Sequence, residues 1–459
     1  MKGAAYRLLV RLLVVPFVLV LLRRGFRDRG WWRDFSQRFG FGPTRPAGSI
    51  WIHAVSVGEV QAAAALVRAL QHPPLQRPVT VTTTTPTGAA RARALFAARR
   101  DATPGAPDAA PVEVRFLPLD TAGSVRRFLD RVQPSIALVI EKEIWPQLFH
   151  ECTRRQIPVV LASAALAPRA MARYRRLLTI FAGTLTAGLH VAAQSEADAA
   201  RFAAIGVPAA RLQVIGNLKF DLALPEGLAA AGRVWREHYG WQQRFVLVAG
   251  STYEPEEEAL LAAQRRLRDA GVDLALVLAP RHPPRFAAVA TRLQHAAVAF
   301  RRHSQHAAVA FRRHSQPAEA AADPDGGRID VLLLDTLGDL LQCYAGADAA
   351  FVGGSLIEGV GGHNLLEPAA LAVPTLTGPH AANAPEIAAA LRAQQALAVV
   401  HDAESLTAAL RLWIDQPALR RQSGERAQQF VARNRGTLQR LLGIVEPLIA
   451  AAKLPSTSR

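Results

Sequence analysis

The chain has 459 residues, half of them hydrophobic, with 54 lysines and arginines against 37 aspartates and glutamates. That length is too great for one ordinary core and fits two or three domains with a large buried interior. The net charge of +17 suggests an anionic partner. Since no nucleic-acid motif accompanies it, an anionic lipid surface is favoured over nucleic acid as that partner. Cys152 and Cys343 lie far apart in apolar contexts, which predicts two buried thiols.

The N-terminal segment predicts a membrane anchor at residues 1–30. Its apolar run, LLVVPFVLVLL at 12–22, has basic residues on both sides, namely Lys2, Arg7, Arg11, Arg23, Arg24, Arg27 and Arg29. No small-residue cleavage site follows, which argues against a signal peptide. A span needs about 20 apolar residues, so the segment is expected either to span marginally or to lie in one leaflet. A buried core helix is the minority alternative. The positive flank, with Trp31 and Trp32, predicts that the following chain stays cytoplasmic.

After residue 48, short β-branched runs alternate with alanine-rich helical runs, a pattern typical of parallel sheets with crossover helices. The predicted strands are residues 50–53, 79–84, 112–116, 136–140, 157–162, 189–193, 245–249, 273–278, 329–334, 348–352 and 374–377. Two open α/β domains joined by a hinge are therefore expected, with a ligand-binding cleft between the carboxyl ends of their strands. The expected boundaries are 31–216 for the first domain, 217–232 for the hinge, 233–432 for the second domain and 433–459 for a C-terminal helix and tail.

A perfect tandem repeat interrupts the second domain. The sequence QHAAVAFRRHS occupies residues 294–304 and again 305–315, which is too short an array for a solenoid. We expect one copy to supply a strand at Val309 and the other to loop out. The following stretch, 317–328, reads as a loop, and its Asp323-Pro-Asp325 reads as a turn rather than a metal-binding pair.

The first predicted strand ends in a junction, HAVSVGEVQA at 53–62, that opens a helical run. Ser56 and Glu59 fit a capping box, in which each side chain binds a backbone N–H of the first turn. From the local pattern alone this structural role is favoured. Two features weaken it. Gly58 costs about 1 kcal/mol within a helix yet lets another molecule approach the backbone closely, and the junction lies at a strand's carboxyl end, where the cleft is expected.

A second acidic site, EKEIWP at 141–146, follows the buried run at 136–140. Its carboxylates are expected at the same sheet edge as Glu59. One interpretation is a solvated loop in which Lys142 neutralises its neighbours. The functional interpretation makes Glu141 part of an acceptor-binding site.

The densest cluster is FVGGS at 351–355 followed by GGHNLLEP at 361–368, with two glycine pairs around a strand end and a helix start. Exposed N–H groups at a helix start bind phosphate, and Glu367 is placed to take a ribose diol. The spacing matches neither the dinucleotide fingerprint nor a P-loop. Tight turns with a capped helix are the structural alternative.

Three further loops follow predicted strands of the second domain, namely GST at 250–252, PRHP at 280–283 and DTLGD at 335–339. Because the strands are expected to be parallel, these loops should face one crevice. Arg281 is the best fixed cation there for a phosphate. His282 alone is more often structural, and Thr336 with Asp339 also fits a capping box.

Taken in order, the junction at Glu59, EKEIWP, GNLKFD at 216–221 and the second-domain loops resemble one family, the Kdo (3-deoxy-D-manno-octulosonic acid) transferases of lipopolysaccharide synthesis. The resemblance runs from about Trp32 to beyond Glu386. It implies a GT-B-type glycosyltransferase, with two Rossmann-like domains whose parallel sheets face a cleft, behind an N-terminal membrane-anchoring helix. It also implies transfer of Kdo from CMP-Kdo to lipid IVA, the lipid A precursor, on the cytoplasmic side of the inner membrane.

The resemblance assigns the family's catalytic base to Glu59. The family's CMP-contacting residues correspond to Pro280, Arg281, Leu337, Gly338, Asp339, Asn364, Leu365, Leu366 and Glu367. Glu59 is expected to deprotonate the acceptor hydroxyl for an inverting attack, and Arg281 with helix N-termini to stabilise the leaving CMP without a metal or cofactor. Because a helix N-terminus lowers the pKa of a carboxylate, the apolar cleft or bound substrate is expected to offset that effect at Glu59.

The sequence departs from the family's pattern at Lys142, Gln147, Leu365 and the AANAPE segment after His380. The duplicated 11-residue segment has no counterpart in the family. Two other functions stay open: a transferase of the same architecture that uses a UDP-sugar, and a non-catalytic membrane-bound binding protein of the same fold.

Overall fold

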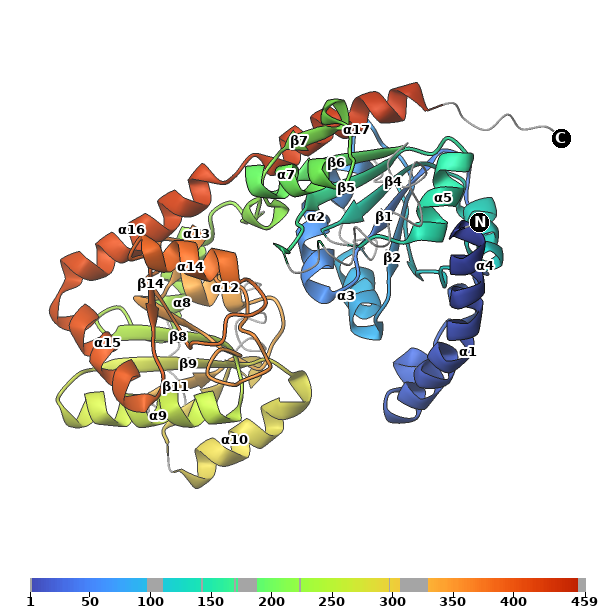
Figure 1. Cartoon of the computed structure of the whole chain (residues 1–459). Coiled ribbons are helices and arrows are strands. Elements are labelled where there is room, and N and C mark those ends of the chain that lie inside the picture. Colours follow the sequence, from blue (N-terminus) through green and yellow to red (C-terminus); the bar gives the residue numbers. More distant parts are fainter. Residues whose placement is uncertain are drawn as a thin grey trace. The chain divides into compact units, whose positions relative to one another are not determined.

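A computed structural model describes residues 2–96, 110–141, 143–168, 171, 188–222, 224–296, 298–305 and 329–452. The chain divides into two compact units, unit 1 (Met1–Asp221 with Asn434–Arg459) and unit 2 (Leu222–Arg433). Both units are α/β domains built on a parallel sheet (Figure 1), so the predicted fold class of two parallel-sheet domains is confirmed.

The described residues of unit 1 form a seven-stranded sheet, ordered β3-β2-β1-β4-β5-β6-β7. The strands are β1 (Ser49–His53), β2 (Val79–Thr83), β3 (Val112–Phe116), β4 (Pro134–Ile140), β5 (Val159–Ala164), β6 (Leu189–Ala193) and β7 (Leu212–Val214). Each pairs in parallel with its neighbours. The first six match predicted strands, and the sequence pattern does not predict β7, which is short and partly exposed.

Helices cover both faces of this sheet (Figure 1). They are α2 (Val57–Gln71), α3 (Pro86–Phe96), α4 (Ala122–Val132), α5 (Pro146–Arg154), α7 (Glu196–Ala204) and α17 (Thr437–Ala451), with short 3-10 turns η1 (Arg29–Trp31), η2 (Phe35–Phe39), η4 (Ala209–Arg211) and η5 (Leu218–Phe220). Side chains alternate along a strand, so Trp51 packs with α4, α5 and α7, while Ile50 and Ile52 pack with α2, α3 and α17. Burial on both faces explains why the strands read as continuous apolar runs.

The chain begins with α1 (Lys2–Arg27), whose last turns are fixed to unit 1 by Trp32. The indole Nε1 of Trp32 donates to the Leu22 carbonyl at 3.0 Å, and a Cβ at Gly25 would lie 1.8 Å from that nitrogen. Gly25 is thus the notch that admits the indole ring. Within the described ranges, no helix has an apolar stretch long enough to cross a membrane.

Unit 2 repeats the architecture, and its described part forms a seven-stranded parallel sheet ordered β10-β11-β9-β8-β12-β13-β14. The strands are β8 (Phe245–Thr252), β9 (Leu274–Pro280), β10 (Phe300–Arg302), β11 (Val331–Leu333), β12 (Ala349–Val352), β13 (Thr375–Thr377) and β14 (Leu397–Val399). The sequence pattern does not predict β14, a three-residue edge strand, but it does predict β8, β9, β11, β12 and β13.

The helices of unit 2 are α8 (Leu228–His238), α9 (Glu254–Asp269), α10 (Phe286–His295), α12 (Leu340–Ala345), α13 (Leu366–Ala370), α14 (Pro385–Ala393), α15 (Ala403–Asp415) and α16 (Pro417–Arg433), with η6 (Pro283–Arg285). The core on one face of the sheet is built from α9, α10 and α15. The core on the other face includes α8 and α12. Gly232, inside the expected hinge, lies within α8, where a Cβ would meet the Ala345 backbone at 2.5 Å, so it is a helix-packing glycine.

The tandem repeat meets the sheet through its first copy, 294–304, which supplies β10 beside β11. The strand expected at Val309 lies outside the described residues, as do the segment 317–328 with Asp323 and Asp325, Lys142, and the tail from 453. Both cysteines are free, buried thiols, as predicted.

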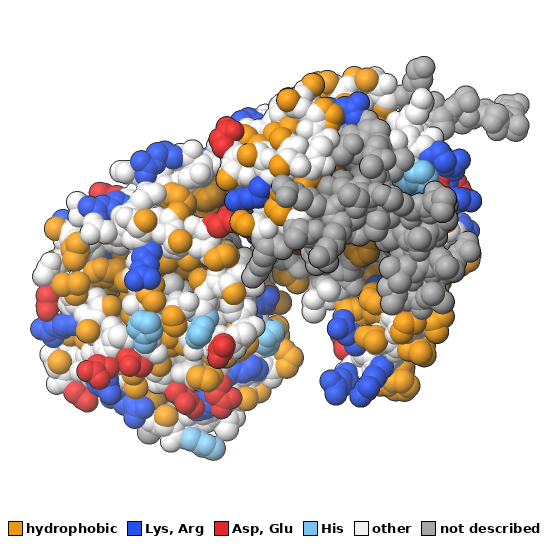
Figure 2. Space-filling model, viewed as in Figure 1, with side chains coloured by type: hydrophobic (Ala, Val, Ile, Leu, Met, Phe, Trp, Pro, Cys, Tyr) orange, Lys and Arg blue, Asp and Glu red, His pale blue; other side chains and the backbone are white. Residues whose placement is uncertain are grey.

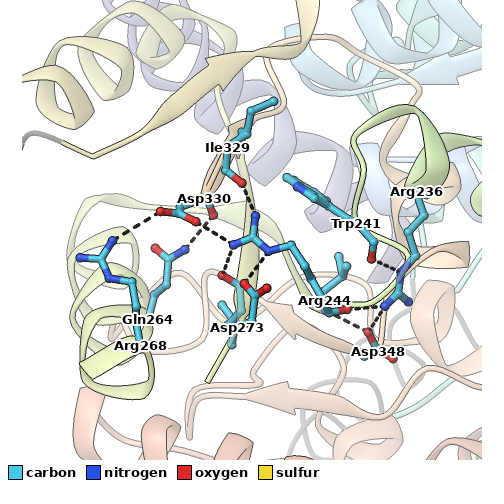
Figure 3. Close-up of polar contacts among 11 residues, drawn as sticks. Arg236, Trp241, Arg244, Gln264, Arg268, Asp273, Ile329, Asp330 and Asp348 are labelled. Atoms are coloured by element: carbon cyan, nitrogen blue, oxygen red, sulfur yellow. Dashed lines mark hydrogen bonds and ion pairs between the residues drawn. The ribbon is translucent and has the colours of Figure 1, made fainter. Parts of the chain in front are cut away.

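Charged side chains join the amino-terminal ends of the unit 2 strands (Figure 3). Arg244, which is 8% exposed, bonds to Asp273 and to Asp330, each at 2.7 Å. Nearby, Arg236 bonds to Asp348 at 2.8 Å. These groups lie at the end of the sheet opposite the strands' carboxyl ends, so the network is remote from the candidate site. Its role is to hold the strand starts together.

Candidate functional site

The strand order places a crevice in each unit. Chain order reverses at β1, which lies between β2 and β4, and again at β8, which lies between β9 and β12. At such a reversal the loops that follow the two neighbouring strands diverge, and ligands bind between them. In unit 1 these loops lead to Glu59 and Glu141. In unit 2 they lead to Tyr253 and to the glycine-rich segment 353–367.

Glu59 is the third residue of α2 and takes part in its cap. The Ser56 Oγ accepts a long bond, 3.5 Å, from the Glu59 N–H, and the Glu59 carboxylate accepts from the Val55 N–H at 2.5 Å. The expected cap is thus present, although the glutamate reaches one residue further back than in a standard capping box. A Cβ at Gly58 would meet nothing closer than Ser56 Oγ at 3.9 Å, so the protein's own packing does not require glycine there.

Glu141 is the partner that the fold brings to Glu59. It is 8% exposed, it follows β4 with a positive φ of 62°, and its carboxylate forms an ion pair with Lys219 Nζ at 2.6 Å. Lys219 comes from η5, where Asn217 Oδ1 accepts from its N–H at 3.0 Å. The cation beside Glu141 therefore comes from GNLKFD, about 80 residues later in the chain.

The pKa of Glu59 is raised from 4.5 to about 7. Burial of the carboxylate is the largest cause, followed by the negative charge of Glu141, whereas the Val55 N–H and the positive charge of Lys219 lower the pKa. The helix terminus and its hydrogen bonds favour the ionised form, and here burial and a like charge outweigh them. A carboxylate with a pKa near neutrality is suited to general-base work.

In unit 2 the donor-site candidates begin at the carboxyl end of β9. Pro280 ends the strand, and the Arg281 N–H donates to the Thr252 carbonyl at 3.0 Å. The neighbouring Arg285 is engaged twice by Glu257, at 2.9 and 2.8 Å. In contrast, the guanidinium of Arg281 makes no hydrogen bond or ion pair with the residues that the structure describes, so it remains free for an anion.

The glycine-rich loop differs from the expectation. The carboxylate of Glu256, which is fully buried, accepts the N–H groups of Tyr253, Gly354, Ser355 and Leu356 at 2.8 to 3.1 Å. The amides of the first glycine pair are therefore not open to a phosphate, contrary to the prediction from the sequence pattern, because the Gly354 N–H donates to this carboxylate and the Gly353 N–H donates to the Gly250 carbonyl at 2.9 Å.

The second glycine pair is also engaged. The N–H groups of Gly362 and His363 donate to the carbonyls of Gly354 and Gly353 at 2.7 and 3.1 Å. These two hydrogen bonds precede Asn364 at the start of α13, where the Asn364 Nδ2 donates to Glu367 at 3.0 Å. Of the residues expected to contact CMP in this segment, Leu365 and Leu366 are buried, and only Asn364 and Glu367 present polar side chains.

The loop after β11 carries the third candidate stretch. Leu337 is 79% exposed and Gly338 has a φ of +110° with open space around its Cβ position. Asp339 accepts from Thr336 Oγ1 at 2.5 Å, but it occupies the N-cap position of α12 without capping it, so the expected capping box is not formed. Asp335 is held by Arg302 at 2.7 Å.

Sequence reasoning missed four polar residues near these sites: Lys219, Tyr253, Glu256 and His363. The His363 ring stacks on Tyr253 with 5.9 Å between centroids and 4° between planes. Burial, with the charges of Arg281 and His282, lowers the pKa of His363 to about 4.

A separate groove of about 670 Å³ lies at the β13–β14 edge, lined in part by His380, Arg392 and His401, and contains none of the residues expected to bind the donor.

A family model described as 3-deoxy-D-manno-octulosonic-acid transferase matches residues 33–222. The chain is similar to the 3-deoxy-D-manno-octulosonic acid transferase of Haemophilus influenzae, being 34% identical over 95% of this chain and 96% of the relative. It is also 36% identical to the 3-deoxy-D-manno-octulosonic acid transferase of Bordetella pertussis, over 97% of this chain and 99% of the relative. A putative UDP-N-acetylglucosamine 2-epimerase from Listeria monocytogenes shares the fold, at 14% identity over 90% of this chain and 99% of that chain with a TM-score of 0.51. The chain therefore belongs to the 3-deoxy-D-manno-octulosonic acid (Kdo) transferases and is a glycosyltransferase of the GT-B type.

Proposed function

We propose that this Kdo transferase moves Kdo from CMP-Kdo to lipid IVA with inversion, and that Glu59 is its general base. The observation that carries the proposal is the position of Glu59 at the sheet reversal of unit 1, with its pKa raised to about 7. At neutral pH such a group is ionised in about half of the molecules, and it gains a proton readily.

In the reaction, the Glu59 carboxylate takes the proton of an acceptor hydroxyl as that oxygen attacks the anomeric carbon of Kdo. The bond from that carbon to the phosphate oxygen breaks, and CMP leaves with the electron pair. Open space at the Gly58 Cβ position lets the acceptor approach the first turn of α2. The Glu141–Lys219 pair supplies an acceptor and a donor of hydrogen bonds to the sugar hydroxyls beside the base.

On the donor side, CMP gains negative charge as it leaves, so a fixed cation lowers the barrier. Arg281 is the candidate, because the residues that the structure describes leave its guanidinium unpaired. Pro280 precedes it, and the stretches Leu337–Asp339 and Asn364–Glu367 would hold the nucleotide, with Glu367 close enough to Asn364 for the two to share a ribose diol.

We place the protein at the cytoplasmic side of the inner membrane, held by α1 in one leaflet. Large apolar side chains on α1 are exposed, among them Val15 at 63%, Leu19 at 61% and Phe26 at 80%. Arginines 23, 24 and 27 flank them, and Figure 2 shows hydrophobic and basic side chains together on this part of the surface. A surface that combines exposed apolar and basic side chains favours anionic lipid, such as the phosphorylated acceptor.

The proposal is tested by incubating the purified protein with lipid IVA and either labelled CMP-Kdo or a labelled UDP-sugar. We expect label from CMP-Kdo alone to reach the lipid. Transfer from the UDP-sugar alone would contradict the assigned donor. Binding of CMP-Kdo without any transfer to lipid IVA would contradict the assigned acceptor.

A further inference from the structure

The Tyr253–His363 stack contains a polar atom without a partner. His363 Nε2 is buried, and it makes no hydrogen bond among the residues that the structure describes. The imidazole is held in place by the parallel Tyr253 ring, and His282 meets the same Tyr253 ring edge-on at 5.5 Å between centroids. A Cβ at Gly354 would lie 2.8 Å from the His363 ring, so the loop is closely packed against it.

An unsatisfied buried polar atom is unfavourable, and in a native protein it calls for an explanation such as a ligand that completes it. The low pKa of His363 means that the ring is uncharged at neutral pH, with one nitrogen donating and the other accepting. Of the charges that lower the pKa of this ring, Arg281 has the largest effect, and its guanidinium makes no hydrogen bond or ion pair with the described residues. In the tautomer that carries its proton on Nε2, this nitrogen and the Arg281 guanidinium are two donors without partners among the described residues, which fits an anion.

The buried carboxylate of Glu256 fixes both walls of this stack. It binds the Tyr253 N–H at 3.1 Å and the Gly354 N–H at 2.8 Å. Gly353, the residue before Gly354, in turn accepts the His363 N–H through its carbonyl at 3.1 Å. A Cβ at Gly353 would lie 2.7 Å from Glu256 Oε2, so only glycine permits this close approach.

We propose that His363 binds the donor by donating a hydrogen bond from Nε2 to a phosphate oxygen of the nucleotide, beside Arg281, and that Glu256 is the positioning residue that holds His363 there. The inference rests on the proposed function for the identity of the donor. It adds a binding residue and a positioning residue that the resemblance to the family does not supply.

The direct test measures CMP affinity by calorimetry for His363→Phe, which keeps a ring against Tyr253 but removes the nitrogen. Loss of a hydrogen bond to a charged group is expected to weaken CMP binding about 10- to 100-fold. His363→Gln, which restores an N–H donor, should recover part of the affinity. His295→Gln, on an exposed histidine at the end of α10, is the matched control and should bind like wild type.

The role of Glu256 is tested by a double-mutant cycle with the same readout. Glu256→Gln alone should weaken CMP binding about tenfold. It should weaken binding little further in the His363→Phe background, because both changes remove the same contact between His363 and the phosphate. It should also raise the KM for CMP-Kdo while leaving kcat within a few-fold. Gly353→Ala perturbs the same contact if Glu256→Gln does not fold, and Glu258→Gln, exposed on the same helix, is the control.

Unchanged CMP affinity in His363→Phe would overturn the inference while leaving the proposed function intact. Fully additive effects of Glu256→Gln and His363→Phe would overturn the positioning role. Wild-type protein that binds no CMP would overturn the assigned donor and this inference together. Glu59→Gln separates the two accounts, since the inference expects it to bind CMP normally whatever its effect on transfer.

Discussion

At the scale of single residues, Glu59 performs two tasks that compete for its charge state. The cap of α2 uses the carboxylate as a hydrogen-bond acceptor for Val55, which favours ionisation. Burial and Glu141 oppose ionisation and raise the pKa to about 7. Because glutamine keeps an acceptor oxygen but cannot take a proton, Glu59→Gln separates the cap from the base.

The pH dependence of transfer follows from this pKa. Below about pH 7 Glu59 is protonated in the free enzyme, so kcat/KM should rise about tenfold per pH unit and then level off. A pH–rate profile with CMP-Kdo and lipid IVA checks this. A profile that stays flat between pH 5 and 7 would contradict the assignment.

Folding stability should respond to the same group. The folded pKa lies above the unfolded value of 4.5, so between pH 4.5 and about 7 the folded state holds a proton that the unfolded state has released. This contribution to the free energy of unfolding is present below pH 4.5 and is lost as the pH rises to 7. Glu59→Gln avoids that loss, so at pH 8 we expect it to melt no lower than wild type in a thermal scan.

Lys219 controls the charge balance around Glu59. The Lys219 ammonium pairs with Glu141 at 2.6 Å, and its charge lowers the pKa of Glu59. Lys219→Met removes this charge, so the midpoint of the pH–rate profile should move upward by about half to one unit. The double variant Lys219→Met, Glu141→Gln removes both charges and should bring the midpoint back. A midpoint that is the same in the single variant and wild type would show that Lys219 does not act on the base.

At the scale of elements, the ends of helices and strands carry most of the buried charge. Asp221, the last residue of unit 1's first segment, caps α17 by accepting the N–H groups of Gly436 and Leu438. The aspartate of GNLKFD thus ties the C-terminal helix to unit 1. Asp221→Ala should lower the free energy of unfolding by about 1–2 kcal/mol in urea titration, and Asp269→Ala, at the exposed end of α9, should change it much less.

Arg244 is the key residue at the strand starts of unit 2 (Figure 3). Replacing it with methionine leaves Asp330, which is 7% exposed, without its closest cation. Breaking a buried pair in this way is expected to cost about 3–5 kcal/mol, measured by chemical unfolding. Arg411→Met breaks an exposed pair with Asp415 and should cost less than about 1 kcal/mol. Equal effects of the two would contradict the role of burial.

The sequence predicted the long, β-branched strands because burial on both faces gives them continuous apolar runs. It did not predict β7 and β14, since three residues at a sheet edge carry little pattern. Glu256 escaped notice for a different reason. It lies in EPEEEA, which reads as the solvated first turn of a helix, and its partners at Gly354–Leu356 are about 100 residues away. The role of Lys219 was missed for a similar reason, because its segment was predicted to be a hinge and its partner Glu141 is distant in the sequence.

At the scale of the whole molecule, the chain combines two domains of one architecture with an exposed apolar helix. We expect the protein to bind vesicles that contain anionic lipid and to be released by salt. Replacing Arg23, Arg24 and Arg27 with glutamine should weaken binding about 5-fold per residue, in line with about 1 kcal/mol for each charge near the surface. Flotation assays at several salt concentrations measure this, and salt-independent binding would contradict the electrostatic contribution.

The central claim is that Glu59 is the general base of Kdo transfer, and the most direct test compares Glu59→Gln with wild type in a single-turnover transfer of labelled Kdo from CMP-Kdo to lipid IVA. The account predicts that the variant folds, binds CMP like wild type and transfers Kdo about 100- to 10,000-fold more slowly. Transfer within tenfold of wild type would contradict it. Glu59 would then be only the cap of α2, and Glu141 would become the next candidate for the base.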